Sequence, residues 1–491
     1  MYYFESLLVM SILVFPVLGI ILLLFLRPRK EWMLPVIAMV PIVLSLVSLI
    51  SLLPALRANN NIGFVLPWIE PMGVGFLIHV DWLSFPYLVT ELVVTLIAIL
   101  FCLGDTYSLK QNKFYYIVIL LFGLGMSGTT LADDMFLFYI FWEVMLVASC
   151  GLILLWGRDA RREGIALKYF IITHLGSLTV LVAMLILFSR SGSASLALLR
   201  SNPVILAPGL IVLVMVLFLI GFGTKMAIFP MHLWLPDAHT AAPMPVTIML
   251  AAAMLSMGTY GLLRFPFSFF SIEQLSGFAL PMMIIGLFSE IYGALMALAE
   301  RDMKRIIAYS SVSQMGYIMF GLGSMTQQGV MGASMHVIYH AIVKALLFIV
   351  VGILLETTRK KYVDELGGLA AKLPLITALA IVGVLGISGM PPLGIFTSEW
   401  MIFSGGFKAG NFGLTVVTII SSLLSVVYAL RFVGLIFFKK SDAPLELEKP
   451  MVWALVSGLL LVALLIVSGI FPGLMLDWTQ RGLLDILGGI L

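Results

Sequence analysis

The segment GTKMAIFPMHLWLPDAH, residues 223–239, decides the fold class of this chain. It places Lys225 at the end of a long apolar run and follows it with two prolines, which interrupt an α-helix. A second segment of this kind, GISGMPPLGIFTSEW at 386–400, puts Glu399 shortly after a Pro-Pro pair. Helices broken beside an ionisable residue, in corresponding positions of two halves, are typical of inverted-repeat transporters.

The composition around these segments predicts a membrane protein. Of the 491 residues, 61% are hydrophobic and 11% are charged, and the mean hydropathy is +1.12. The net charge of +3 is too small to indicate a nucleic-acid partner. The only cysteines, Cys102 and Cys150, lie far apart in apolar segments, so we expect no disulfide framework, metal site or redox cofactor in this chain.

Apolar runs of about 18 to 25 residues, long enough to cross a bilayer, recur along the whole chain. We predict an all-α protein of about fourteen transmembrane helices, with breaks in helices 7 and 12 and two inverted five-helix repeats. The expected spans lie near 6–26, 33–53, 83–104, 114–130, 135–156, 165–189, 207–228, 243–264, 276–299, 305–323, 331–355, 373–403, 413–438 and 451–475. The whole chain, 1–491, is then one transmembrane domain, made of N-terminal helices (1–110), a first repeat (111–265), a second repeat (275–440) and a C-terminal helix (450–491).

The loops predict the orientation. Most loop lysines and arginines fall in odd-numbered loops, for example Arg158, Arg301, Lys304 and Arg359. Because basic loops stay in the cytoplasm, we expect both termini outside a cell membrane. The first apolar segment is interpreted as a span and not as a signal peptide.

Two ionisable residues lie deep in the spans of the first half. Glu143 is embedded in MFLFYIFWEVMLVASC, and Lys225 ends the seventh span. A charge at bilayer depth costs roughly 2.5–3.5 kcal/mol, so such residues normally pair or line a wet path. Changing the distance between them would switch whether the lysine keeps its proton. The alternative is a structural Glu that locks two helices.

A second group lies on one helix face. His336, His340 and Lys344 fall at i, i+4 and i+8, about 6 Å apart along the helix. Protons could step along this stripe through water to Glu399 in the broken twelfth span. The alternatives are two packing histidines with a lysine that reaches the cytoplasmic surface, and a solvated Glu399 at a helix break. A metal site is disfavoured, since no matching carboxylate or Cys lies nearby in sequence.

Other polar residues are candidates for relay or for a channel mouth. His232, Asp237 and His239 follow Lys225 and could form a cytoplasmic mouth or cap a loop. His174 in the sixth span is either a relay or a hydrogen-bonded core residue. Glu290 in the ninth span has no cation in its own helix turn, and its role is open.

Six segments resemble the antiporter-like membrane subunits of respiratory complex I, energy-converting membrane hydrogenases and Mrp-type sodium/proton antiporters. They are FYIFWEVML around Glu143, REGIALKYFIITHLGS at 162–177, KMAIFPMHLWLPDAHTAAP at 225–243, RDMKRIIAYSSVSQMGYI at 301–318, HVIYHAIVKALLFIVVG at 336–352 and GISGMPPLGIFTSEW at 386–400. The resemblance implies that Glu143 and Lys225 form an ion pair in a first half-channel. It also implies that Glu399 is the last residue of a central axis.

Two positions depart from that family pattern. Ser256 in AAAMLSMGTYGLLRF stands where the family usually has a buried lysine, so a link from Lys225 to His340 and Lys344 would run through water or His174. Glu290 is an additional acid. An acid at Glu399 resembles the complex I and hydrogenase subunits more than the Mrp ones.

The sequence therefore predicts a proton- or sodium-translocating subunit of a redox-driven complex, without a bond-making catalytic centre of its own. Its expected partners are other membrane and peripheral subunits, including antiporter-like ones, together with lipid, and iron–sulfur clusters or other redox cofactors are expected in those subunits. The first rival is an Mrp-type antiporter subunit without redox drive. The others are a solute transporter with a substrate-sized central cavity, and a purely structural scaffold.

Overall fold

The computed structural model describes residues 2–26, 30, 32–59, 61–69, 73–103, 112–202, 205–440 and 446–487. The first half forms α1 (Tyr2–Phe25), α2 (Met33–Ser51), α3 (Leu53–Asn59), β1 (Asn61–Ile69), β2 (Val74–Asp81), α4 (Ser84–Cys102), α5 (Lys113–Leu131), α6 (Met135–Trp156), α7 (Arg162–Ser191), α8 (Leu196–Ser201), α9 (Pro208–Met226), η3 (Met231–Trp234), α10 (Leu235–Ala241), α11 (Met244–Met249), η4 (Leu250–Met254), α12 (Ser256–Arg264) and α13 (Pro266–Phe269). The second half forms α14 (Ile272–Ala299), α15 (Met303–Gly323), α16 (Gln327–Thr358), η5 (Val363–Glu365), α17 (Leu369–Lys372), α18 (Pro374–Ile387), α19 (Gly394–Lys408), α20 (Phe412–Val433), η6 (Gly434–Phe438), α21 (Val452–Ile470) and α22 (Gly473–Leu487).

The helices are those of a multi-pass membrane protein. Within the described residues, twelve helical stretches are long and apolar enough to cross a membrane. Two predicted spans fall outside this set. One is α15, which has a polar face described below, and the other is the pair α18 and α19, each of which is short because the chain breaks between Ile387 and Gly394. The break in the seventh span lies between α9 and α10, so both predicted interruptions are confirmed.

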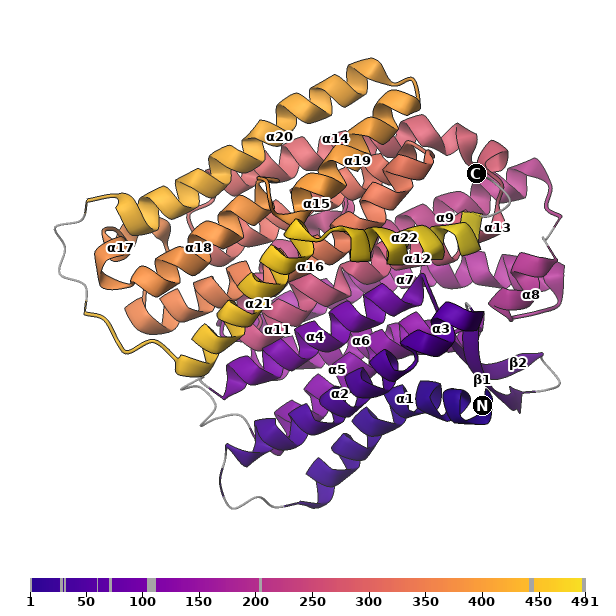
Figure 1. Ribbon diagram of the computed structural model, residues 1–491, viewed down its shortest axis with the longest axis horizontal. Coiled ribbons are helices and arrows are strands. Elements are labelled where there is room, and N and C mark those ends of the chain that lie inside the picture. The colour runs from indigo at the N-terminus through magenta and orange to yellow at the C-terminus, as the bar shows by residue number, and fades with distance from the viewer. Residues whose placement is uncertain are drawn as a thin grey trace.

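The long helices lie side by side in an elongated bundle, with α1 and α2 along one edge, α14 and α20 along the opposite edge, and α16 through the middle (Figure 1). α16 packs against α4, α15, α18, α19 and α21. In the most apolar 18-residue stretch of α16, 100% of the residues are buried, whereas in that of α21 only 28% are buried. Polar groups on α16 are therefore shielded from lipid by other helices. The division into two inverted repeats stays a prediction, and its boundary at residues 110/111 lies outside the described residues.

The end of the bundle that carries β1 and β2 is held by short backbone contacts. The two strands form an antiparallel hairpin in which Asn61 pairs with Asp81, in a segment that the sequence analysis treated as a loop. Isolated bridges join Ile78 to Ala132 and Asp134 to Ser195. The even-numbered loops thus gather at one end, which we call the hairpin end. At the other end, a bridge joins Asp302 to Tyr362 of the odd-numbered loops.

A buried ion pair fastens the hairpin to the bundle. Arg264, at the end of α12, is 0% exposed, and its two terminal nitrogens lie 2.6 and 2.8 Å from the Asp81 carboxylate. His79 Nε2 lies 3.0 Å from the same carboxylate. Burial alone raises the pKa of Asp81, but the charges and hydrogen bonds of Arg264 and His79 outweigh it and hold this pKa well below its usual value.

We expect Asp81→Asn to leave the Arg264 charge buried and unpaired, and so to lower the free energy of unfolding by about 3–5 kcal/mol. Denaturant unfolding in detergent at neutral pH would measure this. The matched control is Asp477→Asn, whose partner Arg481 has a 43% exposed side chain; this change should cost about 1 kcal/mol or less.

The pH dependence follows from the lowered pKa of Asp81. A carboxylate with a lowered folded-state pKa stabilises the protein above its unfolded-state value of about 3.9, and the stabilisation is lost as the pH falls through the folded-state value. The difference between wild type and Asp81→Asn should therefore close only below about pH 4. A difference that closed on going from about pH 5 up to 8 would contradict this account.

Candidate functional site

The centre of the site is a stripe of three residues on α16. His336, His340 and Lys344 are each at most 1% exposed, and α16 runs through them without interruption from Gln327 to Thr358. The helix is continuous, so the i, i+4, i+8 spacing places them on one face, as predicted. We call His336, His340 and Lys344 the central stripe.

α15 supplies the polar partners of the central stripe. Lys344 Nζ donates to the carbonyl oxygen of Ile307 at 2.9 Å and to the Ser310 hydroxyl. His336 Nε2 lies 3.0 Å from Gln314 Oε1, one helical turn beyond Ser310. The polar side chains of α15 therefore bond to the polar side chains of α16. These polar residues also explain why α15 is not one of the twelve apolar helical stretches.

The broken helix α19 completes this group. His336 Nδ1 lies 3.0 Å from the Ser398 hydroxyl, and the next residue, Glu399, is 7% exposed. The Glu399 carboxylate lies directly against Gly389 in the break, where a Cβ atom would sit 2.1 Å from Glu399 Oε2. Gly389 also has φ of +63°, a conformation that favours glycine. The break thus places the acid next in sequence to Ser398, which contacts the central stripe.

In the first half, Glu143 contacts α7. His174 Nδ1 lies 3.1 Å from Glu143 Oε2, and Ser177 donates to Glu143 Oε1. Lys225 Nζ lies 5.0 Å from the centre of the Trp142 ring and makes no hydrogen bond with the described residues. The charge of Glu143 acts on Lys225, but the described residues include no Glu143–Lys225 ion pair within 4.0 Å. The direct pair implied by the resemblance is thus absent in this conformation.

The three polar residues after Lys225 have different surroundings. Asp237 accepts from Lys168 and Arg305, each at 2.8 Å. His232 packs against aromatic rings, with its ring centre 4.8 Å from that of Tyr292. The printed contacts of Asp237 and His232 therefore do not include the central stripe.

His239 is the member of this group that approaches the central stripe. It is 0% exposed and stacks on Phe348 of α16, with 5.5 Å between ring centres. Its carbonyl oxygen lies 3.4 Å from Lys304 Nζ. His239 therefore joins the second part of the broken seventh span, α10, to α16.

Lys304 was missed by the sequence analysis, which assigned it to a basic loop. Lys304 is 6% exposed, and its Nζ donates to the carbonyl oxygen of Ala242 at 2.8 Å and lies 3.4 Å from Thr247 Oγ1. It also lines a polar cavity of about 440 Å³ with Arg158, Asp302 and Arg359 at the end opposite the hairpin end. Its position two residues after the N-capping Asp302 of α15 was the available signal. The cavity and Lys304 lead toward His239.

The remaining predicted residues lie around this core. Ser256 is 4% exposed and bonds to the carbonyl oxygen of Ala253, just after the π-helical turn η4. The His174 side chain is 35% exposed, on a helix that packs against α6 and α9. Glu290 is 1% exposed, accepts from Ser421 of α20, and lies within range of the Glu399 charge. Because the His174 side chain is partly exposed and its helix α7 packs against α6 and α9, His174 is poorly placed to link Lys225 to the central stripe.

Sequence reasoning also passed over Glu91 in α4. It is a single acid inside the span SFPYLVTELVVTLIAILFC and is 1% exposed. The signal was the same one that singled out Glu143, a carboxyl group in the middle of an apolar run.

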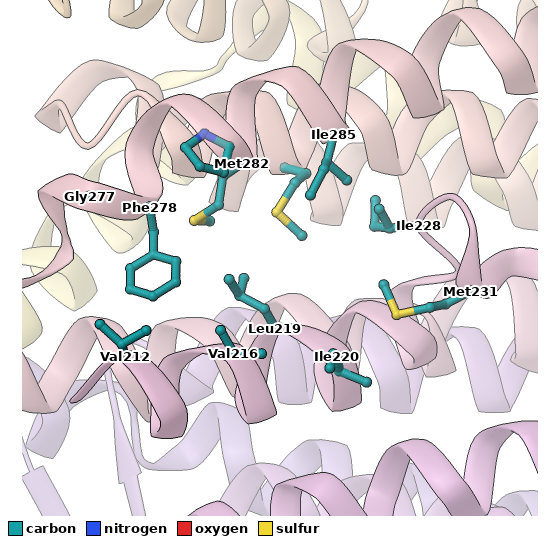
Figure 2. A pocket seen from close by; sticks show the side chains of 12 residues that line it. Val212, Val216, Leu219, Ile220, Ile228, Met231, Gly277, Phe278, Met282 and Ile285 are labelled. Atoms are coloured by element: carbon teal, nitrogen blue, oxygen red, sulfur yellow. The ribbon is translucent and has the colours of Figure 1, made fainter. Parts of the chain in front are cut away.

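The cavity between α9 and α14 is apolar. It measures about 470 Å³, and twelve residues line it, among them Val216, Met231, Phe278 and Met282 (Figure 2). None of the twelve is ionisable, so this cavity does not offer the convergent polar groups with which solute sites fix their ligands. Among the described residues, no three His, Cys, Asp or Glu side chains are grouped to hold a metal ion.

Gly389 provides a test of the Glu399 position. We expect Gly389→Ala to push the carboxylate away from the break and to lower ion transport roughly as far as Glu399→Gln does, because the new Cβ would lie 2.1 Å from Glu399 Oε2. Transport into vesicles by the assembled protein would be compared with that of Gly410→Ala. Gly410 has φ of +76° and nothing within 4 Å of its added Cβ, so it shares the backbone strain of about 1–2 kcal/mol without the collision. Equal transport by the two variants would contradict the assigned position of Glu399.

Comparison with known proteins identifies the family of this chain. The family described as "NADH:quinone oxidoreductase/Mrp antiporter, TM" matches residues 132–425. NADH-quinone oxidoreductase subunit M of Escherichia coli K12 is 34% identical over 439 residues, covering 86% of this chain and 84% of that one. NAD(P)H-quinone oxidoreductase chain 4 1 of Synechococcus sp. JA-3-3Ab is 33% identical over 78% of this chain and 73% of its own length.

Solved structures show the same fold. A chain of respiratory complex I from Thermus thermophilus has a TM-score of 0.86 at 25% identity, covering 98% of this chain and 100% of that one. A chain of the archaeal membrane-bound sulfane sulfur reductase has a TM-score of 0.85 at 27% identity, with 95% and 76% covered. A chain of the Mrp complex from Dietzia sp. has a TM-score of 0.86 at 21% identity, with 98% and 97% covered, and shows the fold alone. This chain therefore belongs to the NADH:quinone oxidoreductase/Mrp antiporter family of transmembrane subunits.

Proposed function

We propose that this protein is an antiporter-like, proton-translocating subunit of a multisubunit, redox-driven membrane complex. The observation that carries the proposal is the buried interface in which α15 and α19 give polar partners to the central stripe. Burying Lys344 and two histidines in a membrane protein is costly. A scaffold would be more stable with apolar residues there, so we infer that the ionisable groups are retained for transport.

The proposed route begins at the polar cavity beside Lys304. It continues past His239 to Lys344, because Lys304 Nζ lies 3.4 Å from the carbonyl oxygen of His239 and the His239 ring stacks on Phe348, one turn beyond Lys344 on α16. From Lys344 it follows the central stripe to His336 and Ser398, and it ends at Glu399. His239 takes the linking role that the sequence analysis gave to water or His174.

Glu143 and Lys225 act in this proposal as a gate. Lys225 Nζ has no hydrogen-bonding partner among the described residues, whereas Glu143 is bound to His174 and Ser177. A shift of Glu143 toward Lys225 would stabilise the protonated lysine, and the reverse shift would favour proton release. Glu290 and Ser256 are auxiliary to the route, with Glu290 able to share a proton with the region around Glu399.

The chemistry of the ligands favours protons over sodium. The groups on the route are mainly lysine and histidine nitrogens, whereas Na⁺, like other hard cations, is held by clustered oxygens. The expected partners are other membrane and peripheral subunits, including further antiporter-like chains, with iron–sulfur clusters or other redox cofactors in those subunits. The similar quinone oxidoreductase chains support this membership. We place the chain in a cell membrane with the hairpin end and both termini outside.

A second candidate is a subunit of an Mrp-type antiporter driven by an existing ion gradient. The Mrp chain from Dietzia sp. has the same fold. The chains that co-purify with this protein distinguish the two, since redox subunits among them support the first candidate and their absence supports the second.

The double variant Lys225→Ala, Lys344→Ala tests the proposed function. In the complex purified from its host and placed in vesicles, we expect proton transport to fall by roughly a hundredfold or more, as for loss of a positioned proton-transfer group. The control is Lys408→Ala, an exposed lysine at the end of α19, which should transport like wild type. Wild-type transport by the double variant would refute the proposed function.

A further inference from the structure

The helix that carries His239 is too short to hold its own position. α10 has seven residues; η3 precedes it, and the backbone is extended at Ala242 and Pro243 after it. Isolated helices of fewer than about 12 residues are marginal even in water, and the first N–H and last carbonyl groups of a helix have no partner within it. The place of His239 against α16 must therefore come from the contacts that α10 makes with other helices.

α15 supplies a cation to the C-terminal end of α10. Lys304 Nζ donates to the carbonyl oxygen of Ala242 at 2.8 Å, and it lies 3.4 and 3.5 Å from the carbonyl oxygens of His239 and Thr240. These are among the last carbonyl groups of the helix, where a positive charge is favourable. Lys304 is buried, so little solvent screens this contact.

The next residue of α15 binds the other end of α10. Arg305 Nη1 donates to Asp237 Oδ1 at 2.8 Å, and Lys168 of α7 donates to Asp237 Oδ2 at 2.8 Å. Asp237 lies in the first turn of α10, where a carboxylate is also favourable. Two consecutive residues of α15 thus bind the two ends of one short helix. We call Lys304, Arg305 and Asp237 the α10 clamp.

Arg305 connects the α10 clamp to the second half of the chain. Its Nε donates to Glu300 Oε1 at 2.7 Å, and Glu300 is the residue that caps the end of α14. Arg431 of α20 donates to the carbonyl oxygen of Glu300 at 3.0 Å. A guanidinium holds several N–H donors in a fixed plane, so Arg305 fixes Asp237 relative to Glu300. The position of α10 therefore depends on α14, α15 and α20 as well as on α7.

His239 has no hydrogen bond from its own side chain that would hold its ring in place. The ring stacks on Phe348 of α16 with 5.5 Å between ring centres, and neither ring nitrogen has a hydrogen-bonding partner among the described residues. Asp237 precedes His239 by two residues in the same short helix, so a shift of α10 moves both. A displacement of about 1 Å can cost a reacting group about a hundredfold in rate.

We propose that Arg305 and Asp237 are positioning residues for His239, because together with Lys304 they hold α10 at both ends and keep the His239 ring against α16. Arginine does not release its proton in proteins, so Arg305 acts through geometry and charge and is not itself a step of the route. This inference rests on the proposed function and adds to it the contacts that set the position of His239.

The experiment compares Arg305→Gln with Arg301→Gln in the purified complex in vesicles. Glutamine at position 305 removes the charge that binds Asp237 and Glu300, so we expect proton transport to fall by roughly tenfold. Arg305→Lys keeps a positive charge near Asp237 but not the planar fork, and it should restore part of the loss. Arg301 is the matched control at the same end of the bundle, since its 68% exposed side chain binds Asp364. Arg301→Gln should transport like wild type.

The Arg305→Gln complex should still assemble. The side chains of Arg305 and Asp237 are 29% and 31% exposed, and ion pairs that water reaches contribute little to global stability. Electron cryo-microscopy of this variant then measures position itself. We expect α10 to shift and the His239 ring to leave Phe348, whereas both stay in place in Arg301→Gln. An undisturbed stack in Arg305→Gln would overturn the inference, whether or not transport falls.

His239→Gln is measured alongside to separate this inference from the proposed function. If His239→Gln loses transport while Arg305→Gln transports like wild type, the positioning inference is wrong and the proposed route stands. If His239→Gln itself transports like wild type, the proposed route through His239 is wrong.

Discussion

The structure depends on one constraint: polar groups at bilayer depth must find their partners inside the protein. Lipid offers none, so each unpaired group there raises the free energy by several kcal/mol. The contact between α15 and α16 meets this constraint, since Ser310 and Gln314 on α15 bond to Lys344 and His336 on α16. The position of α16 in the middle of the bundle follows, because only there can other helices cover its whole circumference.

The two broken spans serve the same constraint in another way. A break frees backbone carbonyl groups and lets a side chain leave the helix surface, which is tolerated where protein surrounds the break. Beyond the first break, His239 of α10 reaches α16, and the carbonyl oxygen of Ala242, which ends α10, accepts from Lys304. At the second, Gly389 leaves the space into which the Glu399 carboxylate folds. Both breaks therefore place ionisable groups beside the central stripe without exposing them to lipid.

Most of the fold and part of the site could be predicted from the sequence. Hydropathy and prolines predict the apolar spans and both breaks, and the spacing of His336, His340 and Lys344 predicts their common face. Partners from distant segments have no local signal, which is why the contact of His239 with α16 is seen only in three dimensions. Lys304 was assigned to a loop because a lysine beside a helix start is ordinarily solvated. The β1–β2 hairpin was missed because a short segment between spans resembles a loop.

The central claim is that these ionisable groups form one hydrated route across the membrane. The most direct measurement is an electron cryo-microscopy map of the assembled complex that resolves ordered water. The account predicts waters that bridge His239 to His340 and His336 to Glu399, so that polar atoms follow one another from the Lys304 cavity to Glu399. Dry, closely packed apolar side chains between these residues, in every conformation of the working complex, would contradict it.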